Sequence, residues 1–520
     1  MTGHPGAIAE TTPDRDAIIA EDGSRLSYGA LDQRSLALAQ QLHAHGIRPG
    51  DAIALLIGNR PDFFVAAWAA QRSGLYYIPV ATKLTPTELS YIFEDSGARA
   101  VILDPALRVS AVAGLAPLGD KSPLVLSLDP GTEFDVVATE VDPTLPLPKA
   151  VEGGDMLYTS GTTGKPKAVR RDLPLGPLGS DLRRAARAAD LFGMQGDSVF
   201  LSPAPLYHAA PLRFAMGQLR TGGSVVMMFK FNAEKALELI ERERVTHSQW
   251  VPTMFSRLLD LPANVRTRYD LSSHQVAIHA GAPCPVETKR RMIEWWGPIL
   301  HEYYSGTEGV GFTHSTSHDW LAHPGTVGKP YGCLVHIVGE EGKELAAGET
   351  GTVYFEGRAG LVYHNDPDKT RDAHTAQGWA TFGDVGHVDE DGFVFLSDRR
   401  SFTIVSGGVN IYPAEIEDAL SSHPAVLDSA VFGVPDPSFG EIVQAVVQLR
   451  SDAPSQALAE DIRQHLAERI ASFKLPKFIA FRSDLPRTET GKLQKHRIRD
   501  DYLDTANRGF DMRRSVGAGG

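Results

Sequence analysis

The chain contains 520 residues, of which 42% are hydrophobic and 22% are charged, and its formal net charge is -13. This length and apolar content predict a globular protein of several structural units with at least one large core. The negative charge is spread along the chain, which disfavours nucleic acid or an anionic membrane surface as the main partner.

The first hundred residues alternate between strand-like and helix-like segments. Ser27 can cap a helix that ends at Gly46, and Thr85 and Glu88 have the spacing of a capping box with a proline at the first helical position. The remaining segments are the strands 52–57, 76–80 and 101–103 and the helix 62–73. Strands that alternate with helices predict a largely parallel sheet.

The rest of the chain divides into three further units. Residues 224–228, 233–244 and the apolar stretch that begins at Thr253 repeat the alternation and predict a second doubly wound sheet. From residue 325 to residue 397, short alternating strands are separated by glycine and acidic turns, which indicates a β-rich unit. Beyond it, helices at 414–420 and 457–470 and strands at 430–434 and 445–449 outline a small α+β domain. The predicted fold class is therefore α/β.

The cysteines and the N-terminus indicate the cellular setting. Cys284 and Cys333 lie far apart and without Cys-x-x-Cys spacing, so the sequence offers no ligands for a disulfide framework or a zinc site. Residues 1–16 lack the basic and then apolar order of a signal peptide, and no apolar run approaches about 20 residues. We therefore expect a cytoplasmic protein without an integral membrane segment.

A loop suited to phosphate binding follows Tyr158. Its residues are Thr159, Ser160, Gly161, Thr162, Thr163, Gly164, Lys165 and, after a proline, Lys167. Glycines let backbone N–H groups converge on an anion, hydroxyls add donors and help to position magnesium, and lysines offset negative charge. The loop lacks the Gly-Lys-Ser/Thr ending of a Walker loop, so a different class of nucleotide loop is predicted.

This loop resembles the signature of the adenylate-forming superfamily, which includes acyl-CoA synthetases, peptide-synthetase adenylation domains and luciferases. The resemblance runs from about residue 15 to about residue 500 and is closest in appearance to bacterial fatty or aryl acyl-CoA ligases. It implies that the chain binds ATP and Mg²⁺, adenylates a small acid with release of pyrophosphate, and passes the acyl group to CoA with release of AMP.

Two segments in the middle of the chain match nucleotide-binding positions of the superfamily. The resemblance implies that Tyr304 lies against adenine, that Thr307 contacts phosphate, and that Glu308 holds the metal. Read alone, a Thr-Glu pair is an ordinary helix start. The turn that approaches the adenine face is matched by Gly281, Ala282 and Pro283.

The ribose position is matched by Asp384 and Arg399. In the superfamily an aspartate accepts hydrogen bonds from both sugar hydroxyls and an arginine assists, which is the role implied here. The family usually has a small hydroxyl residue where Phe382 stands, so the surroundings of the sugar are expected to differ.

The C-terminal part matches a mobile domain that serves both half-reactions. The resemblance implies that Lys492 is the catalytic lysine of adenylation, that Gly408 leaves a passage for the thiol, and that Lys474 contacts CoA. It also implies an N-terminal domain at 1–397 that binds ATP and the acid, a hinge at 398–402 and a C-terminal domain at 403–520. At the hinge, Ser401 and Phe402 replace the usual Lys-Asp, which makes the second half-reaction less secure than the first.

The acid pocket is matched by residues that can equally be core residues: His208, Trp250, His279, Gly306 and Val310. Trp250 and His279 hint at an aromatic or compact polar acid. One alternative is adenylation without CoA transfer, either to load a carrier protein or to activate an unusual acid such as nitrite for attack by an aryl amine. Another is a binding protein that retains the fold without catalysis. The oligomeric state is expected to be a monomer or a homodimer.

Overall fold

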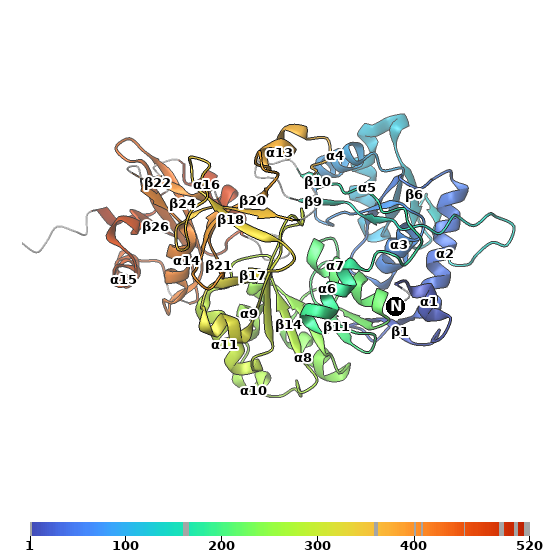
Figure 1. Ribbon diagram of the computed structural model, residues 1–520, viewed down its shortest axis with the longest axis horizontal. Helices are drawn as coiled ribbons and strands as arrows, with labels where there is room; N and C mark the ends of the chain where they lie inside the picture. Colours follow the sequence, from blue (N-terminus) through green and yellow to red (C-terminus); the bar gives the residue numbers. More distant parts are fainter. Residues whose placement is uncertain are drawn as a thin grey trace, which may run out of the picture.

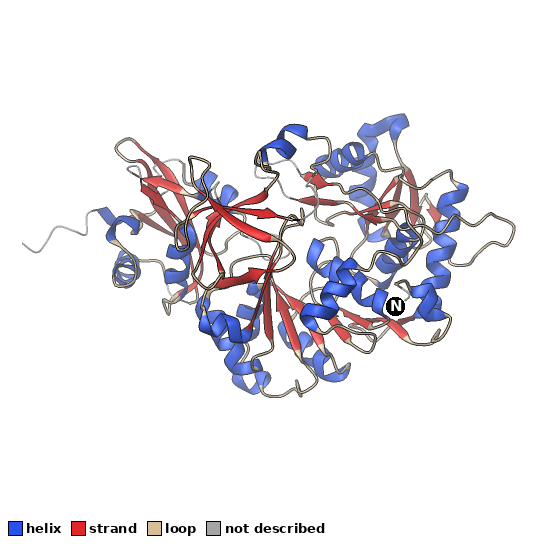
Figure 2. Ribbon diagram, in the orientation of Figure 1, coloured by secondary structure: helices blue, strands red, loops and turns tan. Residues whose placement is uncertain are grey.

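The N-terminal part of the computed structural model contains a wholly parallel sheet (Figures 1 and 2). The structure describes residues 3–159, 166–357, 362–399, 402–406, 409–451, 453–487, 493–503 and 508–513, with backbone alone at 159, 398 and 399. The strand order is β7 (Asp135–Val136), β6 (Leu124–Ser127), β5 (Ala100–Leu103), β3 (Ala52–Leu56), β4 (Tyr76–Pro79) and β8 (Gly154–Asp155). The helices of this part are α1 (Pro5–Ala9), α2 (Tyr28–Ala44), α3 (Pro61–Gln71), α4 (Pro86–Ser96) and α5 (Arg108–Leu115), with 3-10 turns at Pro105–Leu107 and Ala116–Lys121.

A second, longer sheet joins the predicted second doubly wound unit to the β-rich unit. Its largely parallel part contains β2 (Arg25–Ser27), β1 (Asp16–Ala20), β12 (Ser224–Met227), β11 (Val199–Ser202), β13 (His247–Trp250), β14 (Val276–His279) and β15 (Leu300–Tyr304). The antiparallel part contains β16 (Thr313–Thr316), β17 (Thr326–Pro330), β21 (Val394–Arg399), β20 (Ala380–Val388), β19 (Gly351–Glu356) and β18 (Leu334–Val338). A separate hairpin pairs β9 (Leu157–Thr159) with β10 (Lys167–Val169).

Helices cover this second sheet and link its strands. They are α6 (Arg183–Phe192), α7 (Ala209–Thr221), α8 (Ala233–Arg242), α9 (Pro252–Leu259), α10 (Ala263–Arg266), α11 (Val286–Trp296), α12 (Ser317–Ala322) and α13 (Pro367–Asp372). One buried cluster packs α8, α9 and α11 against the parallel strands, and another packs α2, α3 and α7 between the two sheets. These cores hold the strand ends that carry the candidate site.

The C-terminal part is a small α+β unit, which confirms the predicted fold class. Its sheet contains β23 (Val409–Ile411), β22 (Ile404–Ser406), β25 (Gly440–Leu449), β26 (Phe478–Arg482) and β27 (Phe510–Asp511), and β24 (Val426–Asp436) pairs with β25. Its helices are α14 (Pro413–Ser421), α15 (Gln456–Ala467) and α16 (Lys495–Asp501), with a 3-10 turn at Ser472–Lys474. Asp418 of α14 accepts a hydrogen bond at 3.3 Å from the backbone N–H of Val286, at the start of α11. The C-terminal unit thereby contacts the N-terminal part.

Local signals in the sequence account for the helix ends. The Ser27 side chain accepts a hydrogen bond from the backbone N–H of Ala30 and begins α2 as predicted. Thr85 and Glu88 form both bonds of a capping box at the start of α4, and Gly97 ends that helix with φ +60°. No helix in the described residues is long and apolar enough to cross a membrane.

Candidate active site

Residues that lie far apart in the sequence meet between the end of β15 and the paired strands β20 and β21. The hydroxyl of Tyr304, at the end of β15, donates a hydrogen bond at 2.5 Å to Asp384 Oδ2 on β20. Asp384 and Arg399 are directly opposite each other in the antiparallel pair of β20 and β21. The structure therefore brings together the predicted adenine residue and the two predicted ribose residues.

Phe382 fills space that a glycine leaves open. A Cβ atom at Gly306 would lie 2.6 Å from the Phe382 ring, which is closer than packed atoms can approach. The same ring makes edge contact with Tyr304 at 5.5 Å and a tilted contact with Phe355 at 5.3 Å. The departure from the family pattern thus supports the Tyr304 ring, and the absence of a side chain at Gly306 leaves room for the Phe382 ring and the Glu308 carboxylate.

The turn predicted to face adenine follows β14 directly. Gly281 has φ +91°, a conformation that side chains other than glycine rarely adopt. It is exposed, as is Pro283, whereas Ala282 is partly buried. The turn thus lies at the carboxyl end of a parallel strand, which is where ligands bind in sheets of this type.

Glu308 lies among polar groups that sequence analysis did not identify. Its Oε1 accepts a hydrogen bond at 3.0 Å from the hydroxyl of Tyr363, and the Lys369 ammonium lies over the Tyr363 ring at 4.1 Å. Burial and the neighbouring Lys167 lower the pKa of Lys369 to about 8. Asp366 forms an ion pair with Lys167 at 3.2 Å. Two lysines therefore flank a carboxylate of the type that binds Mg²⁺, which is suited to a magnesium–triphosphate ligand.

Several predicted residues lie outside the described part of the chain. They are Ser160, Gly161, Thr162, Thr163, Gly164, Lys165, Gly408 and Lys492, together with the hinge residues 400 and 401. Thr159, for which the backbone alone is described, pairs with Lys167 across the β9–β10 hairpin. The ends of the predicted phosphate loop are therefore adjacent.

His208 is one of two predicted pocket histidines that have a buried ring nitrogen without a partner among the described residues. It precedes α7, and its Nε2 atom is buried without a hydrogen-bond partner among the described residues. Burial lowers the pKa of His208 to about 4, so the ring is neutral at physiological pH. Val310 is 2% exposed and belongs to the core of the antiparallel region. A buried nitrogen without a partner is costly unless a ligand satisfies it.

Trp250 and His279 lie among core residues, and the hint of substrate identity taken from them stays a prediction. Both side chains are fully buried. Trp250 donates a hydrogen bond to Ser248 at 2.6 Å and packs against Trp296, while His279 lies edge-on to Phe255 at 5.3 Å. Packing against α9 and α11 explains the size of Trp250. Both ring nitrogens of His279 lack a hydrogen-bond partner among the described residues, as Nε2 of His208 does.

Lys474 forms an ion pair within the C-terminal unit. Its ammonium lies 2.6 Å from both carboxylate oxygens of Glu415 on α14. Phe402, the last residue of the predicted hinge, lies against the ammonium of Lys495 in the C-terminal unit at 5.6 Å. A phosphate contact by Lys474 would have to displace Glu415.

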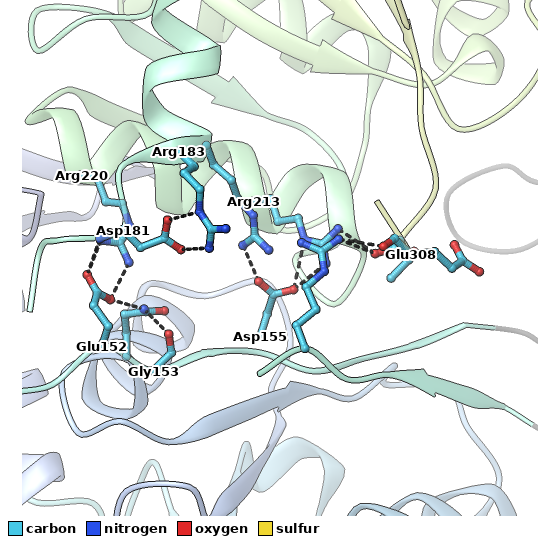
Figure 3. Close-up of polar contacts among 12 residues, drawn as sticks. Glu152, Gly153, Asp155, Asp181, Arg183, Arg213, Arg220 and Glu308 are labelled. Carbon is cyan, nitrogen blue, oxygen red and sulfur yellow. Dashed lines mark hydrogen bonds and ion pairs between the residues drawn. The ribbon is translucent and has the colours of Figure 1, made fainter. Parts of the chain in front are cut away.

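A group of arginines beside Thr307 and Glu308 was not identified from the sequence (Figure 3). Arg171 donates to the backbone carbonyl of Glu308 at 2.9 Å, and Arg213 donates to that of Thr307 at 3.2 Å. Arg184 contacts Asp155 Oδ1 at 2.5 Å, and Arg213 contacts Asp155 Oδ2 at 2.7 Å. These residues come from β8, the segment after β10, α6 and α7, and no single motif contains them.

Comparison with known proteins assigns the family. Residues 7–362 match the family model described as AMP-binding enzyme, and residues 415–492 match the AMP-binding enzyme C-terminal domain. Feruloyl-CoA synthase from Amycolatopsis sp is 33% identical, covering 95% of this chain and 97% of that protein. The 2-succinylbenzoate–CoA ligase from Bacillus subtilis is 29% identical, with 95% and 96% covered. The structure of the amide bond synthetase McbA from Marinactinospora thermotolerans is similar with a TM-score of 0.84 at 28% identity, covering 97% of this chain and 100% of that one. The chain belongs to the AMP-binding enzyme family and is an AMP-forming enzyme of the acid–CoA ligase type.

Proposed function

We propose that the chain activates a carboxylic acid with ATP and transfers the acyl group to CoA. The observation that carries this proposal is the convergence of Tyr304, Asp384 and the backbone of Arg399, with Glu308 four residues after Tyr304. The nucleotide-binding residues expected from the sequence meet there, although about 95 residues separate the first from the last.

In the first half-reaction, a carboxylate oxygen of the acid attacks the α-phosphate of ATP and pyrophosphate leaves. Asp384 accepts hydrogen bonds from the ribose hydroxyls, and Lys167 and Lys369 neutralise the outer phosphates. Lys492 neutralises the charge that develops on the α-phosphate. Mg²⁺, held by Glu308, would supply counter-charge to the phosphates.

In the second half-reaction, the CoA thiolate attacks the acyl carbonyl and AMP leaves. We assign residues 1–397 to the domain that binds ATP and the acid, 398–402 to a hinge, and 403–520 to a domain that rotates between the two steps. Gly408 provides the thiol passage, and Lys474 exchanges Glu415 for a CoA phosphate. Ser401 supplies a tolerant backbone at the hinge, while the contact between Phe402 and Lys495 fixes one end of the hinge to the rotating domain.

A second candidate acceptor is an amine. The full-length similarity to an amide bond synthetase favours it, because an adenylate can be attacked by an amine instead of a thiol. This alternative leaves the first half-reaction unchanged. It also covers activation of an acid such as nitrite for attack by an aryl amine.

The test is a pyrophosphate-release screen over aryl, fatty, amino, sulfonated and inorganic acids, each with CoA, with an amine, or with neither. We expect acid-dependent release, an acyl-CoA product, and a loss of at least about 100-fold in Lys492→Ala with ATP binding retained. Gly408→Trp should preserve pyrophosphate release and block thioester formation.

Each outcome separates the alternatives. Unchanged release in Lys492→Ala would remove the role assigned to that lysine. Thioester formation by Gly408→Trp would refute the passage. Turnover with an amine and no CoA dependence would replace the leading acceptor by the second one.

A further inference from the structure

The carboxylate of Asp155 is surrounded by more positive charge than it can balance. Arg184 and Arg213 both contact it, and Arg171 lies beside them, so these four side chains carry a net charge of +2. Asp155 is 2% exposed at its side chain. Burial alone would raise the pKa of Asp155, but the arginines outweigh burial and hold that pKa far below its usual range. The carboxylate is therefore ionised, and both of its oxygen atoms already contact arginines.

Arg171 has donors to spare. Among the described residues, its Nη2 donates one close hydrogen bond to the Glu308 carbonyl at 2.9 Å and a longer one to the Thr307 carbonyl at 3.5 Å. The side chain keeps access to solvent, while the protein around its guanidinium and the nearby Arg213 and Arg184 lower its pKa to about 9. Gly309 leaves room for the Arg171 side chain, because its φ is +64° and a Cβ atom there would collide with the Arg171 guanidinium.

Uncompensated positive charge of this kind is costly unless an anion binds. Crowded cations that share one carboxylate lose hydration and repel each other. A planar guanidinium with free N–H groups is well suited to a carboxylate or sulfonate, to which it can donate two parallel hydrogen bonds. The arrangement therefore has the chemistry of an anion subsite.

The surroundings associate this subsite with the acid and not with the phosphates. Arg213 lies on α7, which begins directly after His208, and the Arg187 guanidinium lies 4.8 Å from the Phe312 ring. That ring stacks on Tyr303 at 5.1 Å, next to the predicted acid-pocket residues. The phosphate side of Glu308 has its own cations, Lys167 and Lys369.

We propose that Arg171, Arg184 and Arg213 bind a second anionic group, a carboxylate or sulfonate, on the acid that the enzyme activates. This inference rests on the proposed function and narrows its substrate class to compact diacids and sulfonated acids. Arg171 supplies the free donors, and Asp155 orients Arg184 and Arg213.

The test compares diacids and sulfonated acids with their monomethyl esters or uncharged isosteres. Two quantities are measured for each pair: acid-dependent pyrophosphate release, and binding by calorimetry in the presence of a non-cleavable ATP analogue. In the wild type the charged member should be preferred by about 10- to 100-fold in kcat/KM. Arg171→Gln should remove that preference by raising KM with little change in kcat, and Arg171→Lys should restore part of it.

Arg183→Gln is the matched control. Arg183 lies next to Arg184 on α6, its side chain is 80% exposed, and it pairs with Asp181 at 2.9 Å (Figure 3). This variant should keep the preference for the charged acid.

The outcomes separate the subsite from the proposed function. The subsite is refuted if the wild type does not prefer the charged acid over its uncharged counterpart in any pair. It is also refuted if Arg171→Gln weakens ATP binding or inhibition by pyrophosphate to the same extent with both acids of a pair. If calorimetry shows the preference and its loss in Arg171→Gln, but no acid gives pyrophosphate release, the subsite stands and the proposed function fails.

Discussion

Two buried carboxylates three residues apart, Glu152 and Asp155, differ in how much positive charge surrounds them (Figure 3). Glu152 is matched by one arginine, Arg220, with contacts at 3.0 and 3.1 Å. It also accepts hydrogen bonds from the Gln71 side chain at 2.6 Å and from the backbone N–H of Gly179 at 2.7 Å. The Glu152 group is balanced and closed to solvent.

Asp155 instead lies among three arginines, of which Arg171 and Arg184 keep solvent access. Balanced burial is what a structural ion pair requires, because each desolvated charge must be compensated. Excess charge beside the candidate active site is what an anion-binding group requires. Charge balance, more than burial, therefore separates the structural carboxylate of Glu152 from the functional one of Asp155.

The largest effect should follow from Arg220→Met. Removal of the arginine leaves the fully buried Glu152 without its counter-charge, and we expect a loss of about 3–5 kcal/mol in the free energy of unfolding. Urea denaturation measures this change. The control Arg183→Gln removes an exposed pair and should cost less than about 0.5 kcal/mol. Equal losses in both variants would contradict the structural role of Glu152.

A smaller loss, about 2 kcal/mol, is expected for Asp155→Asn. Asparagine still accepts a hydrogen bond, and Arg184 remains 38% exposed at its side chain, so water can hydrate the released charge. Sulfate should stabilise this variant more than the wild type, measured as a shift in Tm. The same sulfate response in Arg220→Met would argue against an anion subsite at Asp155.

The phosphate side of the site should show a pH dependence. Lys369 has a pKa of about 8 without ligand, below its usual value, so its ammonium is lost as the pH rises through 8. ATP binds the charged form, so the KM for ATP should rise about fivefold from pH 8 to pH 9 and stay flat below pH 7. Lys369→Met should abolish this rise, whereas the exposed control Lys343→Met should keep it. A rise that persists in Lys369→Met would assign it to another group.

The smallest effect is expected for the stability of Arg171→Gln. Because this change relieves repulsion without leaving a buried carboxylate unpaired, the free energy of unfolding should stay within about 0.5 kcal/mol of wild type. Thermal unfolding at matched salt measures it. A loss of unfolding free energy comparable to that of Arg220→Met would show that Arg171 is structural. The difference drawn between the Glu152 and Asp155 sites would then be wrong.

Local patterns predicted the elements well, because their causes are local. The caps at Ser27 and Thr85 and the alternation that builds both parallel sheets are encoded within a few residues. The meeting of Tyr304 and Asp384 was expected from the family resemblance alone, since no spacing rule joins residues 80 positions apart.

Other features could not be read from the sequence. The arginines are assembled from three separate segments around Asp155 of β8, so they look like ordinary surface charges in the sequence. The full burial of Trp250 and His279 depends on packing against Trp296 and Phe255, which the strand patterns do not encode. Tertiary packing decided both cases.

The most direct test of the account follows an oxygen label. The acid that gives the most pyrophosphate release is labelled with ¹⁸O in its carboxylate and turned over with ATP and CoA, and the AMP is analysed by mass spectrometry. If a carboxylate oxygen attacks the α-phosphate, one ¹⁸O atom must appear in the AMP phosphate. Unlabelled AMP, or label in another phosphate with release of ADP, would contradict adenylate formation.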